Sequence, residues 1–254
     1  MHTRAAAAWL GLALAGFAWP SVAAAQEMVL AKEIKGANEV TGASAADPLA
    51  PLAADADAGA DAVELSSEAV TQMTNWVIAS GDNNAVPFMV IDKVAAKVLI
   101  FDGQGQLLAA TPALLGVTPG DESAPGVGDR ELSAIKLKDR TTPAGRFVAK
   151  FGTAIGNRKV LWVDYSTALS LHAVVPGTRK ERRLQRLKSP APDDNRITYG
   201  CINVPAQFYA KVVRPLFKDT AGVVYILPET KPLKEVFLAY QDQEKSTPRW
   251  DGSR

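Results

Sequence analysis

Residues 197–204 read Ile-Thr-Tyr-Gly-Cys-Ile-Asn-Val and contain Cys201, the single cysteine of the 254-residue chain. Besides His2, the chain has one histidine, His172, in the segment Ser-Leu-His-Ala at 170–173. A cysteine becomes a nucleophile near neutral pH when a base or an imidazolium lies beside it. Nucleophilic chemistry in this chain would therefore use Cys201 as nucleophile and His172 as base. The alternative is structural, because lone buried thiols and core histidines are common.

The first 25 residues have the pattern of a secretory signal peptide. A basic start at Met1–Arg4 precedes an uncharged apolar run over 5–18, and Ala23–Ala25 offers small residues for cleavage. An uncleaved anchor is the alternative, but a membrane-spanning helix needs about 20 apolar residues and this run is interrupted by a proline. We expect an exported protein of the periplasm or cell envelope, with no stable membrane insertion after cleavage.

Composition narrows the classes of function. An oxidising compartment favours paired cysteines, so a single one suggests a free reactive thiol or an intermolecular bridge. The 28 Lys and Arg residues balance 27 Asp and Glu residues, which gives no overall basic field for nucleic acid. One cysteine and one histidine after cleavage make a zinc site improbable, and we expect no metal and no other cofactor. The oligomeric state is left open.

Composition also divides the chain. Residues 26–65 are rich in Ala, Asp, Gly and Pro and lack aromatic residues, which is typical of a flexible linker or arm. A serine start and apolar residues at helical spacing predict a helix over 66–82 that packs on the main domain. We expect the folded domain over 83–230 and a polar tail over 231–254.

Short apolar runs predict a mainly β domain. The expected strands lie at 88–92, 97–101, 106–110, 147–151, 159–165, 169–175 and 223–227. Apolar residues on one face predict a helix over 205–217. The strands do not alternate with helices, so we expect an antiparallel or mixed β-sandwich with a few short helices. The Gly- and Pro-rich segment 116–129 lacks a phosphate-loop pattern and is expected to be a surface loop.

Three motifs, at residues 142–147, at His172 and at residues 198–204, together resemble the L,D-transpeptidase (YkuD-type) catalytic domain. Residues 142–147, Thr-Pro-Ala-Gly-Arg-Phe, resemble its T-P-x-G-x-F turn, and His172 resembles its upstream histidine. Residues 198–204 resemble its [S/T]-H-G-C-hydrophobic-[R/N] signature, with Tyr199 in place of the signature's histidine. Ala173 stands where the family usually has glycine, and a basic insertion lengthens the segment between histidine and cysteine. The resemblance covers roughly residues 86–227 and implies a YkuD-like β-sandwich.

The resemblance implies an enzyme that acts on peptidoglycan stem peptides. Cys201 would attack a carbonyl of the donor stem, the terminal D-Ala would leave, and an amine of a neighbouring stem would take the acyl group. Such transfer cross-links the cell wall and affects cell shape. Transfer to water instead would make the protein an L,D-carboxypeptidase or endopeptidase. A third alternative is a non-catalytic protein that binds the cell wall.

Two neighbours of Cys201 have candidate roles. Gly200 lets the backbone approach a ligand closely, and the N–H groups of Gly200 and Cys201 are candidates for holding an oxyanion. Thr198 is a candidate for orienting His172 or a substrate carboxylate. A hydrogen bond within the turn is the alternative for Thr198.

The remaining candidates concern substrate contacts. Tyr199 would bond to substrate or pack against neighbouring side chains. Asn203 would bind a substrate amide or cap the following helix. The basic insertion at 179–188 is expected to be a solvated face, and the alternative is that it gathers acidic cell-wall polymer.

Overall fold

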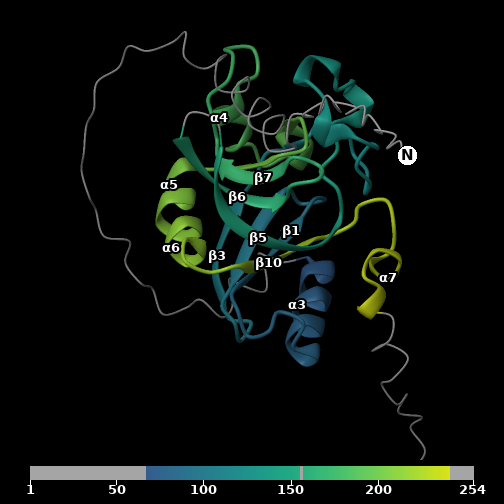
Figure 1. Ribbon diagram of the computed structural model, residues 1–254, viewed down its shortest axis with the longest axis vertical. Coiled ribbons are helices and arrows are strands. Elements are labelled where there is room, and N and C mark those ends of the chain that lie inside the picture. Colours follow the sequence, from purple (N-terminus) through teal and green to yellow (C-terminus); the bar gives the residue numbers. More distant parts are fainter. Residues whose placement is uncertain (1–66, 155–156, 241–254) are drawn as a thin grey trace, which may run out of the picture.

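Figure 1 shows the computed structural model, which describes residues 67–154 and 157–240. The predicted signal peptide, the predicted linker and the end of the predicted tail lie outside the described residues. Among the described helices, none combines the length and the apolar character required to cross a membrane.

The described chain is built around one large sheet. Eight strands are hydrogen-bonded in the order β3-β2-β1-β10-β5-β6-β7-β9, and β4 and β8 form a separate parallel pair. The strands are β1 (Phe88–Asp92), β2 (Lys97–Phe101), β3 (Leu107–Pro112), β4 (Leu115–Gly116), β5 (Gly145–Ala154), β6 (Arg158–Asp164), β7 (Leu169–Ala173), β8 (Arg196–Thr198), β9 (Ile202–Val204) and β10 (Gly222–Ile226).

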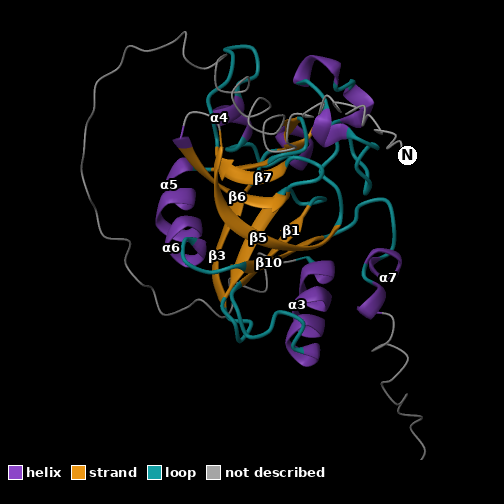
Figure 2. Ribbon diagram, in the orientation of Figure 1, coloured by secondary structure: helices purple, strands orange, loops and turns teal. Residues whose placement is uncertain are grey.

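The long strand β5 connects two halves of the sheet. Its first half pairs with β10 and its second half with β6. Side chains from both halves, such as Met89 and Ile91 of β1 and Leu161 of β6, meet in one buried cluster. The sheet therefore bends along β5 and closes over a shared core, as strands do where they pass from one layer of a sandwich to the other. The predicted mainly β sandwich with few short helices is confirmed (Figure 2).

Helix α3 (Glu68–Ser80) covers the outer face of the first half of the sheet. The Ser67 side chain accepts the N–H of Val70, and Gly81 ends the helix in the left-handed region at φ 68°. Trp76 of α3 meets the ring of Tyr225 edge-on at 6.2 Å between centroids. This helix and strands β1, β2 and β10 enclose a second buried cluster.

The segment after β9 is helical and packs on the shared core. It begins as α5 (Ala206–Phe208), widens to a π-helical turn at η6 (Tyr209–Val213) and ends as α6 (Arg214–Phe217). Its buried residues Val213 and Phe217 lie in the cluster that both halves of the sheet share. Figure 1 shows this helix on one flank of the sheet, away from α3.

The segment 116–129 departs from the expected surface loop. Gly116 forms part of β4, and Asp121 and Gly128 are buried. Asp121 is buried because its Oδ1 pairs with Nζ of the fully buried Lys93 at 2.7 Å. Short helices complete the described chain: η1 (Val127–Asp129), η2 (Leu132–Ala134), η3 (Leu137–Asp139), α4 (Arg183–Arg186), η5 (Pro192–Asn195) and α7 (Leu233–Val236).

Candidate active site

The site is built on two neighbouring parallel strands, β7 and β9. In their register Leu171 lies beside Ile202, and His172 lies beside Asn203. Successive side chains in a strand point to opposite faces. Leu171 and Ile202 point into the core, so His172 and Asn203 share the other face. Cys201, directly before β9, belongs to that face too. The structure thus brings the predicted nucleophile and base to one side of one pair of strands.

Cys201 is a free thiol in a confined environment. Its residue is 5 % exposed. Its Sγ lies 3.6 Å from the Oγ of Ser170 and 3.6 Å from the carbonyl oxygen of Ala168. Ser170 was missed in the sequence, although its position two residues before His172 in a strand predicts the same face. Its hydroxyl is placed to steady the thiol.

The bonds of His172 define where its proton lies. Its Nδ1 is 2.9 Å from the carbonyl oxygen of Ala173, and because a carbonyl only accepts, Nδ1 carries the hydrogen. Its Nε2 is 3.0 Å from Nδ2 of Asn203, a donor, so Nε2 accepts. The guanidinium of Arg183, which only donates, lies 3.3 Å from Oδ1 of Asn203 and fixes which end of the amide faces the imidazole. The arrangement describes a neutral imidazole with its lone pair on Nε2.

The side-chain amide of Asn203 is bonded within the site. The helix that follows begins after Pro205 and has no side-chain cap, so Asn203 does not cap it. Both ends of its buried amide are engaged by His172 and Arg183. Arg183 itself belongs to the basic insertion and is 3 % exposed. The insertion is therefore not a uniformly solvated face, because Arg183 reaches into the site and pairs with Glu181 at 3.1 Å.

The turn before Cys201 requires glycine. Gly200 has φ 131°, and a Cβ there would lie 2.9 Å from the carbonyl oxygen of Thr141. The Thr198 hydroxyl donates to the carbonyl of Cys201 at 2.7 Å and accepts the N–H of Gly200 at 3.1 Å. Thr198 therefore makes a hydrogen bond within the turn, which was the second of its two expected roles. It also engages one of the two expected oxyanion donors, the N–H of Gly200.

Thr142, from the T-P-x-G-x-F motif, holds the other side of this turn. Its Oγ1 donates to the carbonyl of Gly200 at 2.7 Å and accepts the N–H of Gly116 at 2.8 Å. Because a trans peptide points its C=O and N–H in opposite directions, the bond to the Gly200 carbonyl also sets the direction of the Cys201 N–H. Thr142 thereby orients the peptide that precedes the nucleophile.

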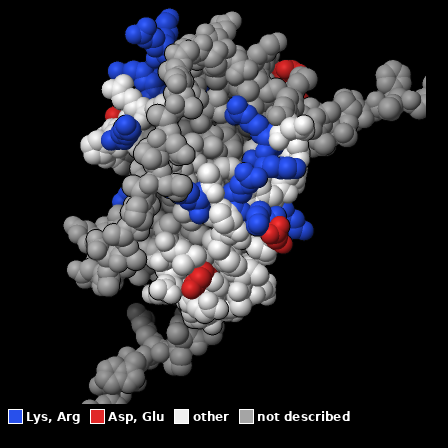
Figure 3. All heavy atoms as spheres, turned by 90° about the vertical axis from the view of Figure 1, so that its left-hand side faces the viewer, with Lys and Arg blue, Asp and Glu red and all other residues white. Residues whose placement is uncertain are grey.

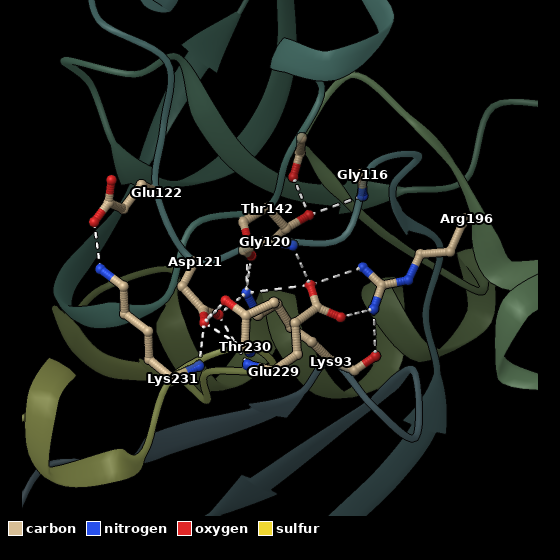
Figure 4. A network of polar contacts seen from close by, with 11 residues as sticks. Lys93, Gly116, Gly120, Asp121, Glu122, Thr142, Arg196, Glu229, Thr230 and Lys231 are labelled. Atoms are coloured by element: carbon tan, nitrogen blue, oxygen red, sulfur yellow. Dashed lines mark hydrogen bonds and ion pairs between the residues drawn. The ribbon is translucent and has the colours of Figure 1, made fainter.

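Thr142 is in turn held by a buried ionic network (Figure 4). The Nζ of Lys93 donates to the Thr142 carbonyl at 3.0 Å, to the Gly120 carbonyl and to Oδ1 of Asp121 at 2.7 Å. It also pairs with Glu229 at 3.4 Å. All three ammonium hydrogens therefore have partners, as a buried cation requires.

The carboxylates of this network are equally well satisfied. Asp121 accepts the backbone N–H groups of Glu229, Thr230 and Lys231. Burial opposes its ionisation, but the bonds from Lys93 and Thr230 outweigh burial and hold the pKa of Asp121 well below its usual value. Glu229 pairs with Arg196, whose guanidinium also donates to the Lys93 carbonyl at 2.8 Å.

Two cavities adjoin the site. The one at Cys201 has a volume of about 20 Å³, room for a single water molecule. Tyr199 forms part of its wall, packs against the cluster that includes Val127 and Ile135 and lies under the guanidinium of Arg140, 3.9 Å from the ring centroid. Tyr199 thus packs against neighbouring side chains, which was one of its two expected roles.

The second cavity lies beside His172 and is much larger, about 400 Å³. It is bounded by the start of β6, the end of β7 and the helix that contains Tyr209 and Arg214. Across residues 67–154 and 157–240, no group of three or more His, Cys, Asp or Glu side chains is arranged to hold a metal ion.

No family model and no curated protein matches the sequence. Among solved structures, the chain is similar to an L,D-transpeptidase from Xylanimonas cellulosilytica (13% identity, TM-score 0.33, 56% of this chain and 61% of that one). It is similar to L,D-transpeptidase 1 of Mycobacterium tuberculosis (14% identity, TM-score 0.31, 56% of this chain and 61% of that one). It is also similar to the helical cell shape determining protein Pgp2 of Campylobacter jejuni (14% identity, TM-score 0.37, 63% of this chain and 57% of that one).

The aligned part is about three fifths of each of these chains. At these identities the likeness concerns the fold alone.

Proposed function

We propose that this protein is a cysteine-dependent L,D-transpeptidase that transfers an acyl group between stem peptides of peptidoglycan. One observation carries the proposal: the parallel register of β7 and β9 places Cys201 and His172, the one thiol and the one described imidazole, on one face of the sheet. The glycine turn at Gly200 and an imidazole whose Nε2 is the accepting nitrogen support it. The motifs at 142–147 and 198–204 supply the choice of substrate.

The first half of the reaction forms a thioester. Nε2 of His172 exchanges its bond with Asn203 for the proton of Cys201, and the thiolate attacks the donor carbonyl. The developing oxyanion is stabilised by the N–H of Cys201, whose direction the Thr142–Gly200 bond sets. The carbonyl re-forms, the C–N bond breaks, and the leaving amine of D-Ala takes the proton from the imidazolium.

The second half transfers the acyl group. An acceptor amine gives a proton to Nε2 of His172 and attacks the thioester, and the departing sulfur of Cys201 takes that proton back. Ser170, 3.6 Å from Sγ, steadies the sulfur in both halves. Water in place of the amine gives the hydrolase alternative.

The organisation of the chain fits this activity. In this proposal residues 83–230 form the catalytic domain, the helix within 66–82 docks on it, and residues 1–25 direct export to the periplasm or cell envelope, where the peptidoglycan lies. Residues 26–65 act as a flexible arm between these parts.

Covalent labelling with a carbapenem tests the nucleophile. One L,D-transpeptidase similar to this chain has been solved in complex with imipenem, so imipenem is the probe. Intact mass spectrometry should find one adduct on the full chain and none on Cys201→Ala. His172→Gln should form the adduct much more slowly, because loss of a general base costs roughly 10²- to 10⁴-fold. Equal labelling of wild type and Cys201→Ala would refute the assignment.

Product analysis separates transfer from hydrolysis. Incubation with purified peptidoglycan fragments should give cross-linked dimers, detected by mass spectrometry and absent with Cys201→Ala. Shortened monomers without dimers would establish the hydrolase instead. Binding to cell wall with neither product would leave the non-catalytic alternative.

A further inference from the structure

We infer that the 400 Å³ cavity beside His172 is a binding site for the carboxylate of the acceptor peptide. That the ligand is the acceptor peptide rests on the proposed function. That it binds through a carboxylate rests on the cavity itself. It adds a recognition site on the His172 side of the strands, separate from the small cavity at Cys201.

The charges around the cavity are of one sign. Arg158, Lys159 and Arg214 line it, and no acidic residue is among its described lining. Figure 3 faces the side of the molecule that carries α5 and α6, where Lys and Arg side chains outnumber Asp and Glu. A cavity with walls of one charge concentrates ions of the opposite charge.

The two guanidinium groups are available to a ligand. Arg158 and Arg214 are exposed, and within the described ranges neither has an ion pair with an Asp or Glu. Other arginines near the site are engaged, as Arg183 is by Glu181 and Arg196 by Glu229. A guanidinium presents paired donors that match the two oxygens of a carboxylate. The amino group of Lys159 is held at the rim by the Thr153 hydroxyl at 2.6 Å.

The apolar lining limits the kind of anion. The apolar part of the wall consists of Val160, Ala173, Val175 and the ring of Tyr209, and Asn157 and His172 complete the lining. Tyr209 is fixed by its hydroxyl, which donates to the Lys159 carbonyl at 2.6 Å, and its burial raises the pKa of that hydroxyl, so the group stays neutral. The volume suits a small peptide end with an aliphatic side chain. A ligand whose carboxylate binds Arg158 and Arg214 would direct its remaining part toward His172. His172 is the base that must deprotonate an acceptor amine.

A binding experiment tests the cavity without requiring catalysis. The full chain with Cys201→Ala is titrated with N-acetyl-D-alanine, with its C-terminal amide and with inorganic phosphate, and the imidazole resonance of His172 is followed by NMR. A His2→Gln variant assigns the two histidine signals. We expect saturable shifts with the free acid and binding at least about tenfold weaker for the amide, because only the acid makes charge-assisted bonds. Equal affinity for acid and amide, or tighter binding of phosphate than of the acid, would overturn the carboxylate assignment.

Matched variants separate the cavity from general charge. Arg158→Gln with Arg214→Gln should weaken binding of the acid about tenfold or more, and Arg158→Lys with Arg214→Lys should restore part of it. Arg179→Gln with Lys180→Gln changes the net charge equally at exposed positions outside the cavity and should leave binding unchanged. Equal losses in both double variants would overturn the site.

The carbapenem test distinguishes the two proposals. Labelled Cys201 without binding of the acid would overturn the cavity assignment alone. Specific binding of the acid with an unlabelled Cys201 would overturn the enzyme and leave an anion-binding cavity.

Discussion

The Lys93 network and the cavity beside His172 use the same kinds of charged side chain in opposite ways. Lys93 is fully buried, and every hydrogen of its ammonium group is bonded within the chain. Arg158 and Arg214 are exposed and have no acidic partner in the described residues. Charges that are satisfied internally hold the backbone in place, whereas charges left open to solvent are available to a ligand. The two regions therefore support the site differently, one by orienting the Cys201 turn and the other by recognition.

The largest effect should follow from breaking the buried network at its centre. Lys93→Met leaves the carboxylate of Asp121 buried without its cation and leaves Glu229 with Arg196 alone. Removing one partner of a buried ion pair typically destabilises a protein by about 3–5 kcal/mol. Urea unfolding measures this loss. Lys150→Met, the same substitution at an exposed position of β5, should change the free energy of unfolding by no more than about 0.5 kcal/mol. Similar values for the two variants would show that the network does not contribute to stability.

The network should also make the protein sensitive to acid. The pKa of Asp121 is lower in the folded state than in the unfolded chain, so the folded state is favoured while this group is ionised. Its contribution is complete above the unfolded value of about 4 and declines as the pH falls from there toward the lower folded value. Asp121→Asn should be less stable than wild type at neutral pH and should lose less stability between pH 5 and pH 2. Parallel stability curves over that interval would contradict this.

A smaller effect is expected where the network meets the active site. Thr142→Val keeps the shape but leaves the Gly116 N–H and the Gly200 carbonyl without their partner, at a cost of about 1–3 kcal/mol. Because the Gly200 peptide is then free to rotate, labelling of Cys201 by imipenem should slow as well. Thr142→Ser retains the hydroxyl and should restore both properties. Normal labelling of a destabilised Thr142→Val would show that the bond stabilises the fold without orienting the turn.

The smallest effect concerns two adjacent arginines in the basic insertion. Arg183→Gln removes the donor that fixes the Asn203 amide, and labelling of Cys201 should slow about tenfold, the result of losing roughly 1.4 kcal/mol of transition-state stabilisation. Arg182→Gln, at an exposed position, should label at the wild-type rate. Equal rates for the two variants would mean that Arg183 does not position His172 through Asn203.

The sequence was sufficient for the strands that carry strong apolar runs. The expected strands at 88–92 and 97–101 match β1 and β2, and the expected helix at 205–217 matches the segment from α5 to α6. Strands β8 and β9 were missed because each has only three residues, too few for any periodicity. Strand β9 is extended because it pairs with β7 and with Leu114, which are contacts from distant parts of the chain.

The two candidate catalytic residues can be selected from residue type alone, whereas the contacts that surround them cannot. Cys201 stands out as the single cysteine of the sequence, and His172 as one of its two histidines. The partners of Lys93 do not stand out, because a lysine, two acids and an arginine scattered along a chain resemble ordinary surface residues. Arg183 was hidden in the same way within a run of basic residues. Burial of a charge depends on long-range pairing, for which a single sequence gives no local signal.

The position of β10 has a consequence for how the chain acquires its structure. Strand β10, the most C-terminal strand within residues 67–154 and 157–240, lies in the middle of the sheet, parallel to β1 and antiparallel to β5. The sheet therefore cannot close while the C-terminal part of the domain is still being synthesised, and pairing over such a long stretch of chain is intrinsically slow. The large sheet should therefore stay incomplete until residues 222–226 have been synthesised. For a chain expected to be exported, this delay keeps the polypeptide in the extended state that translocation through a narrow channel requires.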